Sequence, residues 1–151
     1  CSYIAGFFID KEYKNAFSYL YKTGKGRDDF EISYDDLEKK DWHFSKPVIL
    51  LMNEGSVSSA DEFGVIMRHC TEAVLVGASN AISLIGDSEA TELPNGWVFQ
   101  FGKCGGSLFD NTYNEGDILV MDHEVAQTAE ELDKGVDTQL EFALQLAESL
   151  E

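Results

Sequence analysis

The chain has 151 residues, of which 44% are hydrophobic, and a formal net charge of −17. This composition predicts one globular domain and excludes a disordered or fibrous chain. Nucleic acid is excluded as an expected partner, because phosphate binding needs clustered Lys and Arg and only 11 basic residues stand against 28 acidic ones.

Neither a membrane-spanning helix nor a metal site is expected. The longest apolar run, residues 47–52, is far shorter than the roughly 18–20 residues of a membrane-spanning helix. Cys1, Cys70 and Cys104 have neither the spacing of metal ligands nor the number that a disulfide framework needs. We therefore expect free or buried thiols, and neither a metal nor a cofactor.

The N-terminal third divides into an apolar and a polar part. In residues 2–22 apolar side chains recur at spacings of three and four, which predicts a helix followed by a turn or short strand. Residues 23–45 are polar and charged, with a weak alternation around Phe30 and Ile32. They predict a surface excursion with an edge strand.

The middle of the chain has the pattern of a βαβ unit. The unbroken apolar run of residues 47–52 predicts a buried strand of a parallel sheet. Turn-forming residues follow, and then apolar side chains on one helical face of residues 59–70. A second apolar run, residues 73–77, completes the unit, whose functional turn belongs at the carboxyl end of the first strand. Ser58 lies in that turn.

The C-terminal half alternates short strands, turns and helices. A hairpin is predicted from residues 89–93 and 97–101 around Pro-Asn-Gly, a loop over residues 102–116 and a strand over residues 117–121. A capping-box pattern at Thr128 predicts a short helix that ends at Gly135, and Asp137 starts a final amphipathic helix. The fold class is therefore α/β.

A serine between a buried strand and a helix has two advantages as a nucleophile. The tight turn exposes its hydroxyl, and the N–H groups at the helix N-terminus stabilise an oxyanion. Ser58 has this position, and the amide of Ser59 is the candidate oxyanion donor. The same spacing fits Ser56, Ser58 or Ser59 acting only as the N-cap of the helix.

Residues 46–63, Lys-Pro-Val-Ile-Leu-Leu-Met-Asn-Glu-Gly-Ser-Val-Ser-Ser-Ala-Asp-Glu-Phe, resemble a block of the S41 family of C-terminal processing, or tail-specific, peptidases. In that block a buried strand leads into a Ser-Ala-Ser-Ala-Ser-Glu or Ser-Ala-Ala-Glu element. The resemblance continues in the family's order through residues 73–77, 93–96, 114–116, 120–125 and 134–137. It implies a ClpP/crotonase-like β-β-α core, with residues 1–151 as the C-terminal part of one S41-like catalytic domain. The family's nucleophile then falls on Ser58 and its acidic residue on Asp61.

The resemblance also implies the catalytic partners of Ser58. Members that use a Ser-Lys dyad carry the Lys after the second strand, where this chain has Ser83, so a lysine base is absent. The branch similar to the tricorn core peptidase uses Ser, His and Glu, which corresponds to Ser58 and Glu115 with the His upstream of this chain. A carboxylate orients the imidazole that takes the serine proton. Without such an imidazole, Glu115 is a surface-loop carboxylate.

The three histidines of the chain fit this role poorly. His69 lies on the same predicted helix as Ser58, about 16 Å along the axis at roughly 1.5 Å per residue, which is too far for proton transfer. His43 and His123 have the pattern of surface or structural residues. His43 is the one candidate for a stand-in base.

The resemblance, with the departures from it, implies two main functions. The first is a serine endopeptidase that hydrolyses a peptide or protein through an acyl-enzyme on Ser58. The family's base and glycine-rich oxyanion loop lie upstream, so we expect the isolated chain to be inactive. The alternative is a catalytically degenerate binding module for a peptide or a small apolar ligand, which the loss of the family's Glu and Thr in residues 77–82 favours.

A third function, crotonase-like chemistry on acyl thioesters, is disfavoured by the acidic composition, because it needs basic groups for nucleotide phosphates. The resemblance further implies a location outside the cytoplasm and allows homo-oligomerisation.

Overall fold

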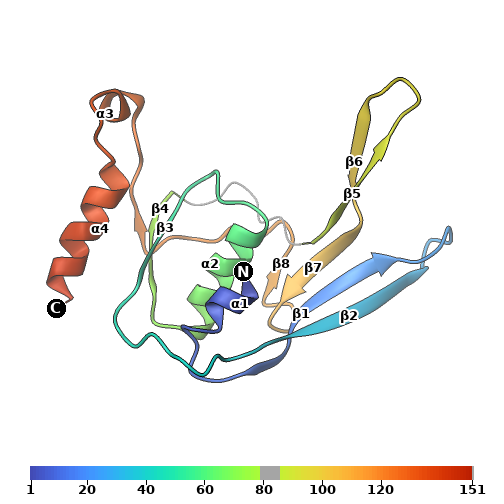
Figure 1. Cartoon of the computed structure of the whole chain (residues 1–151), viewed down its shortest axis with the longest axis horizontal. Coiled ribbons are helices and arrows are strands. Elements are labelled where there is room, and N and C mark those ends of the chain that lie inside the picture. The colour runs from blue at the N-terminus through green and yellow to red at the C-terminus, as the bar shows by residue number, and fades with distance from the viewer. Residues whose placement is uncertain (79–85, 151) are drawn as a thin grey trace.

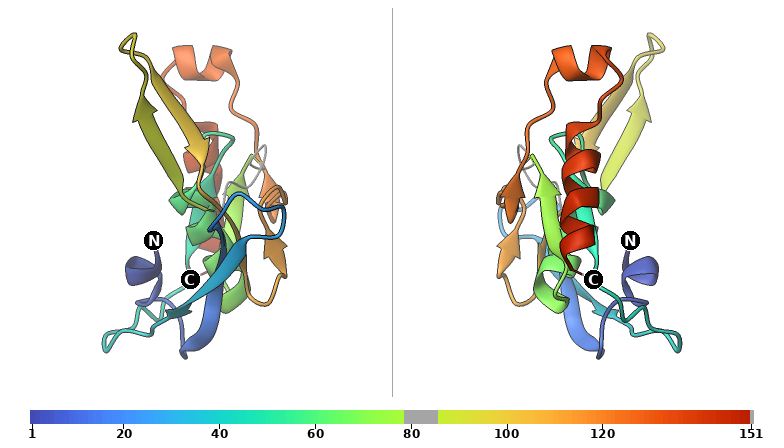
Figure 2. Two further views of the ribbon diagram at one scale, coloured as in Figure 1. Left: turned by 90° about the vertical axis from the view of Figure 1, so that its right-hand side faces the viewer. Right: turned by 90° about the vertical axis from the view of Figure 1, so that its left-hand side faces the viewer.

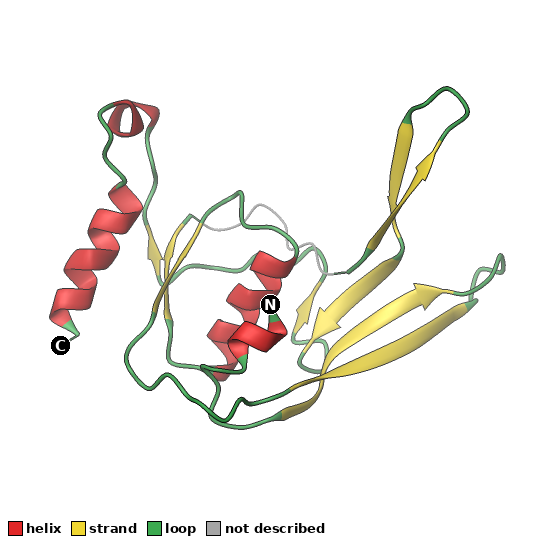
Figure 3. Ribbon diagram, in the orientation of Figure 1, coloured by secondary structure: helices red, strands yellow, loops and turns green. Residues whose placement is uncertain are grey.

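The structure is a computed structural model and describes residues 1–78 and 86–150. Within these residues helices and several sheets combine in one mixed α/β arrangement, which confirms the predicted class (Figures 1 and 3). The elements in chain order are α1 (Ser2–Ala5), β1 (Tyr13–Lys22), β2 (Phe30–Leu37), β3 (Ile49–Met52), α2 (Ser59–Cys70), β4 (Val74–Gly77), β5 (Ser88–Glu92), β6 (Val98–Gly102), β7 (Cys104–Leu108), β8 (Tyr113–Asn114), β9 (His123–Glu124), α3 (Ala129–Asp133) and α4 (Thr138–Ser149).

The prediction for residues 2–22, a helix followed by a turn or short strand, has the right order but the wrong lengths, because the helix is only Ser2–Ala5 and the strand is the ten-residue β1. Strand β1 lies inside an antiparallel sheet of order β2-β1-β7-β8 and pairs with a neighbour on each side. Phe17, Tyr19 and Tyr21 recur at every second position, and aromatic residues at this period fit a pleated sheet. Strand β2 pairs with β1 at Tyr13 and from Phe17 to Lys22, and β7 pairs with β1 from Phe17 to Tyr21. Local helical spacing cannot outweigh this pairing. The predicted edge strand is confirmed as β2.

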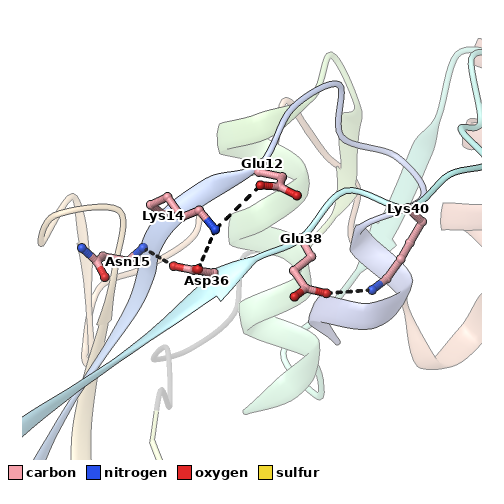
Figure 4. Close-up of polar contacts among 6 residues, drawn as sticks. All are labelled: Glu12, Lys14, Asn15, Asp36, Glu38 and Lys40. Carbon is pink, nitrogen blue, oxygen red and sulfur yellow. Dashed lines mark hydrogen bonds and ion pairs between the residues drawn. The ribbon is translucent and has the colours of Figure 1, made fainter.

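A side-chain contact fixes the irregular start of this sheet. The β1–β2 register shifts between Tyr13 and Phe17, and Asn15 lies in the shift with a φ of 51°. The Asn15 amide donates to Asp36 Oδ1 at 2.8 Å, and Lys14 Nζ lies 2.9 Å from Asp36 Oδ2 (Figure 4). The hydrogen bond from Lys14, followed by that from the Asn15 amide, holds the pKa of Asp36 below its usual range.

The predicted βαβ unit is confirmed. Strands β3 and β4 are parallel, with Ile49 opposite Val74 and Met52 opposite Gly77, and β9 adds a third parallel strand. Helix α2 lies on one side of this sheet and α4 on the other (Figures 1 and 2). The sheet therefore delivers the chain from the carboxyl end of β3 to the first turn of α2.

The contact between β3, β4 and α2 is close because glycines stand where the elements meet. A Cβ on Gly64 of α2 would lie 2.5 Å from Met52 Sδ, and a Cβ on Gly77 would lie 1.8 Å from the Met52 carbonyl oxygen. Ile66, Met67 and Leu75 are fully buried in the core that these elements share. The position of α2 against the sheet is thus tightly set.

The predicted hairpin is confirmed as β5 and β6, which form a separate two-stranded sheet that projects from the body of the molecule (Figures 1 and 2). Gly96 has a φ of +82° in its turn, as the Asn-Gly pattern predicts. Every residue of both strands is solvent-exposed.

The loop predicted over residues 102–116 is partly wrong, because it contains β7 and β8. The sequence of β7, Cys-Gly-Gly-Ser-Leu, has low strand propensity, but β7 pairs with β1 over five positions. The strand predicted over residues 117–121 is also wrong. This segment buries Leu119 and Met121 and exposes Ile118 and Val120, yet it joins no ladder, and the strand follows it as β9.

The C-terminal helices are confirmed. Thr128 caps α3 by accepting a hydrogen bond from the Glu131 amide, and Gly135 follows the helix with a φ of +75°. Asp137 caps α4 through the Leu140 amide. No helix of the described residues is long and apolar enough to span a bilayer.

Candidate active site

The turn between β3 and α2 places Ser58 at the start of the helix. The Ser56 amide donates to the Asn53 carbonyl oxygen at 2.8 Å, and the Asn53 amide donates to Ser56 Oγ at 3.2 Å. This closed turn reverses the chain directly after the strand. Ser58 follows with φ 58° and ψ −122°, a left-handed backbone conformation that side chains other than glycine rarely adopt.

The backbone and side chain of Ser58 are not those of an ordinary helix cap. Its hydroxyl makes no capping hydrogen bond with α2. The Ser56 hydroxyl is already used in the turn. The cap interpretation therefore does not explain the serine at position 58, which is held in a strained conformation with its hydroxyl uncommitted to the helix.

The N-terminus of α2 supplies a backbone donor, the Ser59 amide, directly after Ser58. Among the hydrogen bonds of the described residues none is donated by the Ser59 amide, whereas the next turn closes through the Glu62 amide and the Ser58 carbonyl oxygen at 3.0 Å. The aligned peptide dipoles of the helix make this end partly positive. An anion beside Ser58 would find an available N–H group there.

Glu115 reaches the same region from the antiparallel sheet. Its amide donates to the Gly106 carbonyl oxygen at 3.1 Å, which fixes it beside β7. Its carboxylate lies over Gly105, where an added Cβ would come within 3.2 Å of Glu115 Oε2. Gly105 therefore leaves room for this carboxylate.

Ser58 and Glu115 line one pocket of about 440 Å³. The structure thus brings together two residues that the sequence separates by a helix, a strand and a hairpin. The remaining wall comes from the base of the β5–β6 hairpin and from β7, with Gly86, Ser88, Gln100 and Cys104 among the lining residues. Sequence reasoning missed this wall. The sequence contains one signal of this wall, the hairpin predicted between Ser58 and Glu115. The sequence does not indicate where that hairpin points.

The acidic residues in the first turn of α2 point into the protein. Asp61 is fully buried and Glu62 is 9% exposed. Burial is the largest cause that raises the pKa of Glu62, and the nearby Asp61 raises it further. The Cys1 thiol donates to Glu62 Oε2 at 3.0 Å. Neither carboxylate lines the Ser58 pocket, although the sequence resemblance assigned the family's acidic residue to Asp61.

The histidines lie elsewhere in the described structure. The His69 ring stacks on Phe109 with centroids 4.0 Å apart, and burial followed by the nearby Lys11 lowers its pKa. The His123 ring packs against Phe142 of α4, with centroids 5.3 Å apart. Both rings therefore have structural contacts, which agrees with the prediction of a surface or structural role for His123.

The hypothesis of His43 as a stand-in base is wrong. His43 Nδ1 lies 3.1 Å from the Ile9 carbonyl oxygen, and the ring lines a pocket with Cys70 and Thr71 at the C-terminal end of α2. Ser58 is at the other end of this helix, about 16 Å away at roughly 1.5 Å per residue. Ser83, the position compared with a lysine base, and residues 79–82 of the altered segment lie outside the described residues.

A comparison with sequence profiles identifies one family. The sequence profile of peptidase family S41 matches residues 4–105. No curated protein matches the chain. A solved structure of a candidate peptidase from Parabacteroides merdae ATCC 43184 is 30% identical, with a TM-score of 0.76, and the match covers 97% of this chain and 46% of that one.

More distant structures share the fold. A mutant of CPAF is 11% identical with a TM-score of 0.71, over 99% of this chain and 39% of that one. A lipoprotein from Streptococcus agalactiae is 14% identical with a TM-score of 0.56, over 99% of this chain and 49% of that one. The chain thus spans 39–49% of the length of these three solved structures.

Proposed function

Because the chain belongs to peptidase family S41, we propose that it supplies the nucleophile's half of a serine endopeptidase site, in which Ser58 is acylated by a peptide. The observation that carries this proposal is the backbone of Ser58, with φ 58° and ψ −122° and no capping hydrogen bond. Residues held in such a strained conformation cluster at active sites, where the surrounding structure offsets a cost of about 1–3 kcal/mol.

The proposed reaction has two stages, acylation of Ser58 and hydrolysis of the acyl-enzyme. Ser58 Oγ forms a bond to the substrate carbonyl carbon, and the serine proton passes through a histidine to the leaving amine as the C–N bond breaks. The Ser59 amide donates to the oxyanion, and Glu115 orients the histidine. Water then attacks the acyl-enzyme and releases the carboxylic acid. No cofactor is needed for this sequence.

The proposal requires groups from outside these 151 residues. The histidine and further oxyanion donors would come from the rest of a catalytic domain, with residues 1–151 as its C-terminal part. The match to only 46% and 39% of two of these structures supports this. We further propose a ClpP/crotonase-like core, supported by the parallel β3–α2–β4 unit, and a location outside the cytoplasm.

A fluorophosphonate probe tests the nucleophile in the full-length protein that contains this chain. We expect the wild type to be labelled on Ser58, Ser58→Ala to lose labelling, and Ser56→Ala to retain it, because the Ser56 hydroxyl serves the turn. Equal labelling of wild type and Ser58→Ala would refute the assignment. A folded wild type without labelling would favour the non-catalytic binding module for a peptide or small apolar ligand.

Glu115→Gln tests the carboxylate separately. The substitution keeps the shape of the side chain and removes its charge, so an oriented imidazole would lose its stabilisation. We expect labelling of Ser58 to slow by about 10²- to 10⁴-fold, with an unchanged thermal unfolding midpoint. An unchanged labelling rate would leave Ser58 as nucleophile and remove Glu115 from the site.

A further inference from the structure

Two glycines line the Ser58 pocket for different reasons. Gly86 has a φ of +141°, and a Cβ there would lie 2.5 Å from the Cys104 carbonyl oxygen, so the backbone itself requires glycine. Gly102 has no left-handed backbone, and no described heavy atom lies within 4 Å of a Cβ built on it. The fold would therefore accept a side chain at position 102. Because Gly102 has no side chain, the pocket is open at the end of β6.

The pairing of the hairpin shows toward which side position 102 faces. Gly102 lies opposite Ser88, and Gln100 lies opposite Ala90. Gln100 Nε2 donates to Ser88 Oγ at 2.8 Å, and both residues line the pocket with Ser58. Because side chains alternate along a strand, a side chain at Gly102 would share the face of Gln100 and enter the same pocket.

The other face of the hairpin is chemically distinct. Phe99 and Phe101 stack there with ring centroids 5.7 Å apart. Neither residue lines the Ser58 pocket. A substitution at Phe101 thus tests the hairpin beside Gly102 without changing the pocket wall.

The charge of the pocket wall is negative. Its charged lining residues within the described structure are Asp87 and Glu115. Asp87 Oδ1 accepts a hydrogen bond from the Ser88 amide at 2.8 Å, and no cation of the described residues forms an ion pair with Asp87. A positively charged substrate group would be attracted here, and a carboxylate would be repelled.

We propose that Gly102 and Asp87 determine specificity for the substrate residue whose carbonyl Ser58 attacks. This proposal rests on the proposed function. That substrate residue stays bonded to Ser58 Oγ in the acyl-enzyme, so its side chain lies close to Ser58, and the hairpin wall of the Ser58 pocket is within its reach. Gly102 admits a bulky side chain, and Asp87 favours a basic one over an acidic one.

Peptidyl diphenyl phosphonates that differ only in the residue next to phosphorus test this in the full-length protein. These probes phosphonylate the serine and release phenoxide, and probes with Ala, Phe, Lys and Glu side chains cover size and charge. For Gly102→Val we expect the Phe-to-Ala ratio of labelling rates to fall at least about tenfold. Gly102→Ala should give a smaller fall in the same direction, and Phe101→Leu should leave the ratio unchanged.

Asp87→Asn tests the charge while keeping the oxygen that accepts from Ser88. We expect its Lys-to-Glu rate ratio to fall by about three- to tenfold relative to wild type. Unchanged Phe-to-Ala and Lys-to-Glu ratios, with labelling still on Ser58, would overturn this inference and leave the proposed function standing. A folded wild type that no probe labels on Ser58 would refute both.

Discussion

Ser58 differs from its neighbours by combining a polar side chain with a backbone that favours glycine. Its φ of 58° and ψ of −122° lie where a Cβ is disfavoured. A residue that only capped the helix would adopt an extended backbone, as Thr128 and Asp137 do before α3 and α4. The left-handed conformation at Ser58 is therefore not explained by starting the helix, and we propose that it presents the hydroxyl.

Because the backbone of Ser58 is strained, complete removal of its side chain should stabilise the protein. Ser58→Gly should raise the free energy of unfolding by about 1 kcal/mol, because relief of roughly 1–3 kcal/mol of strain exceeds the entropic cost of glycine in the unfolded chain. Ser58→Ala keeps a Cβ and should stay near the wild type. Urea denaturation of the three proteins measures the difference, and a glycine variant no more stable than the alanine variant would contradict the strain.

At the scale of elements, the turn that presents Ser58 depends on the close contact of β4 with β3. Gly77 ends β4 with a φ of +135°, and its Cβ position lies 1.8 Å from the Met52 carbonyl oxygen. Met52 is the last residue of β3, immediately before the turn that leads to Ser58. A change at Gly77 should therefore reach the candidate site through the backbone.

Gly77→Ala should lower the free energy of unfolding by about 2–5 kcal/mol, because backbone strain and overpacking act together. Gly102→Ala is the matched control, since its Cβ meets no described atom and its φ is ordinary. Thermal unfolding with circular dichroism compares the two. A Gly77→Ala protein as stable as Gly102→Ala would show that the strands separate at this position without cost.

The elements that the sequence predicts correctly are those with strong local signals. The apolar run of β3, the Asn-Gly turn of the hairpin and the caps at Thr128 and Asp137 each combine pattern with local chemistry. Strand β7 and the full length of β1 escape prediction because long-range pairing, rather than local preference, makes them strands. The helix predicted at the start of residues 2–22 is too long for this reason: aromatic spacings fit both periods, and the ladders make residues 13–22 a strand.

The residues of the candidate site also divide into those that local sequence predicts and those that long-range packing places. Ser58 and Ser59 follow from the strand-turn-helix order, which is local. Glu115 follows only from the resemblance, because its approach to Ser58 depends on how β7 and β8 join β1. Gly102 and Asp87 were beyond prediction, since nothing in the sequence indicates that the base of the hairpin lies against the start of α2.

At the scale of the whole molecule, Asp122 connects α2, β4 and the segment before β9. Arg68 Nη1 donates to Asp122 Oδ1 at 2.6 Å, and the Leu75 amide donates to Asp122 Oδ2 at 2.8 Å. Arg68 also donates to the Val120 carbonyl oxygen at 2.8 Å. The hydrogen bond from Arg68, with smaller contributions from the Leu75 amide, holds the pKa of Asp122 below its ordinary value of 3.8.

This shift predicts how stability depends on pH. Because the folded state lowers the pKa of Asp122, the contact stabilises the protein above pH 3.8 and is lost as the pH falls through the lower folded value. Asp122→Asn should cost about 1 kcal/mol at pH 7, a modest loss since the carboxylate is 37% exposed. The cost should shrink below pH 3.8.

Urea denaturation of both proteins between pH 2 and pH 7 measures this difference, with Asp133→Asn as control. The Asp133 side chain forms no hydrogen bond or ion pair within the described structure, so its substitution should have little effect at any pH. A cost of Asp122→Asn that stays constant down to pH 2 would show that the charge of Asp122 does not contribute.

Acylation of Ser58 can be observed as the mass of the full-length protein after acid quenching during turnover of a peptide ester. We expect a mass increase equal to the acyl part of the substrate, located on the peptide that contains Ser58 and absent from Ser58→Ala. Hydrolysis that proceeds without an adduct and is unaffected by Ser58→Ala would contradict it.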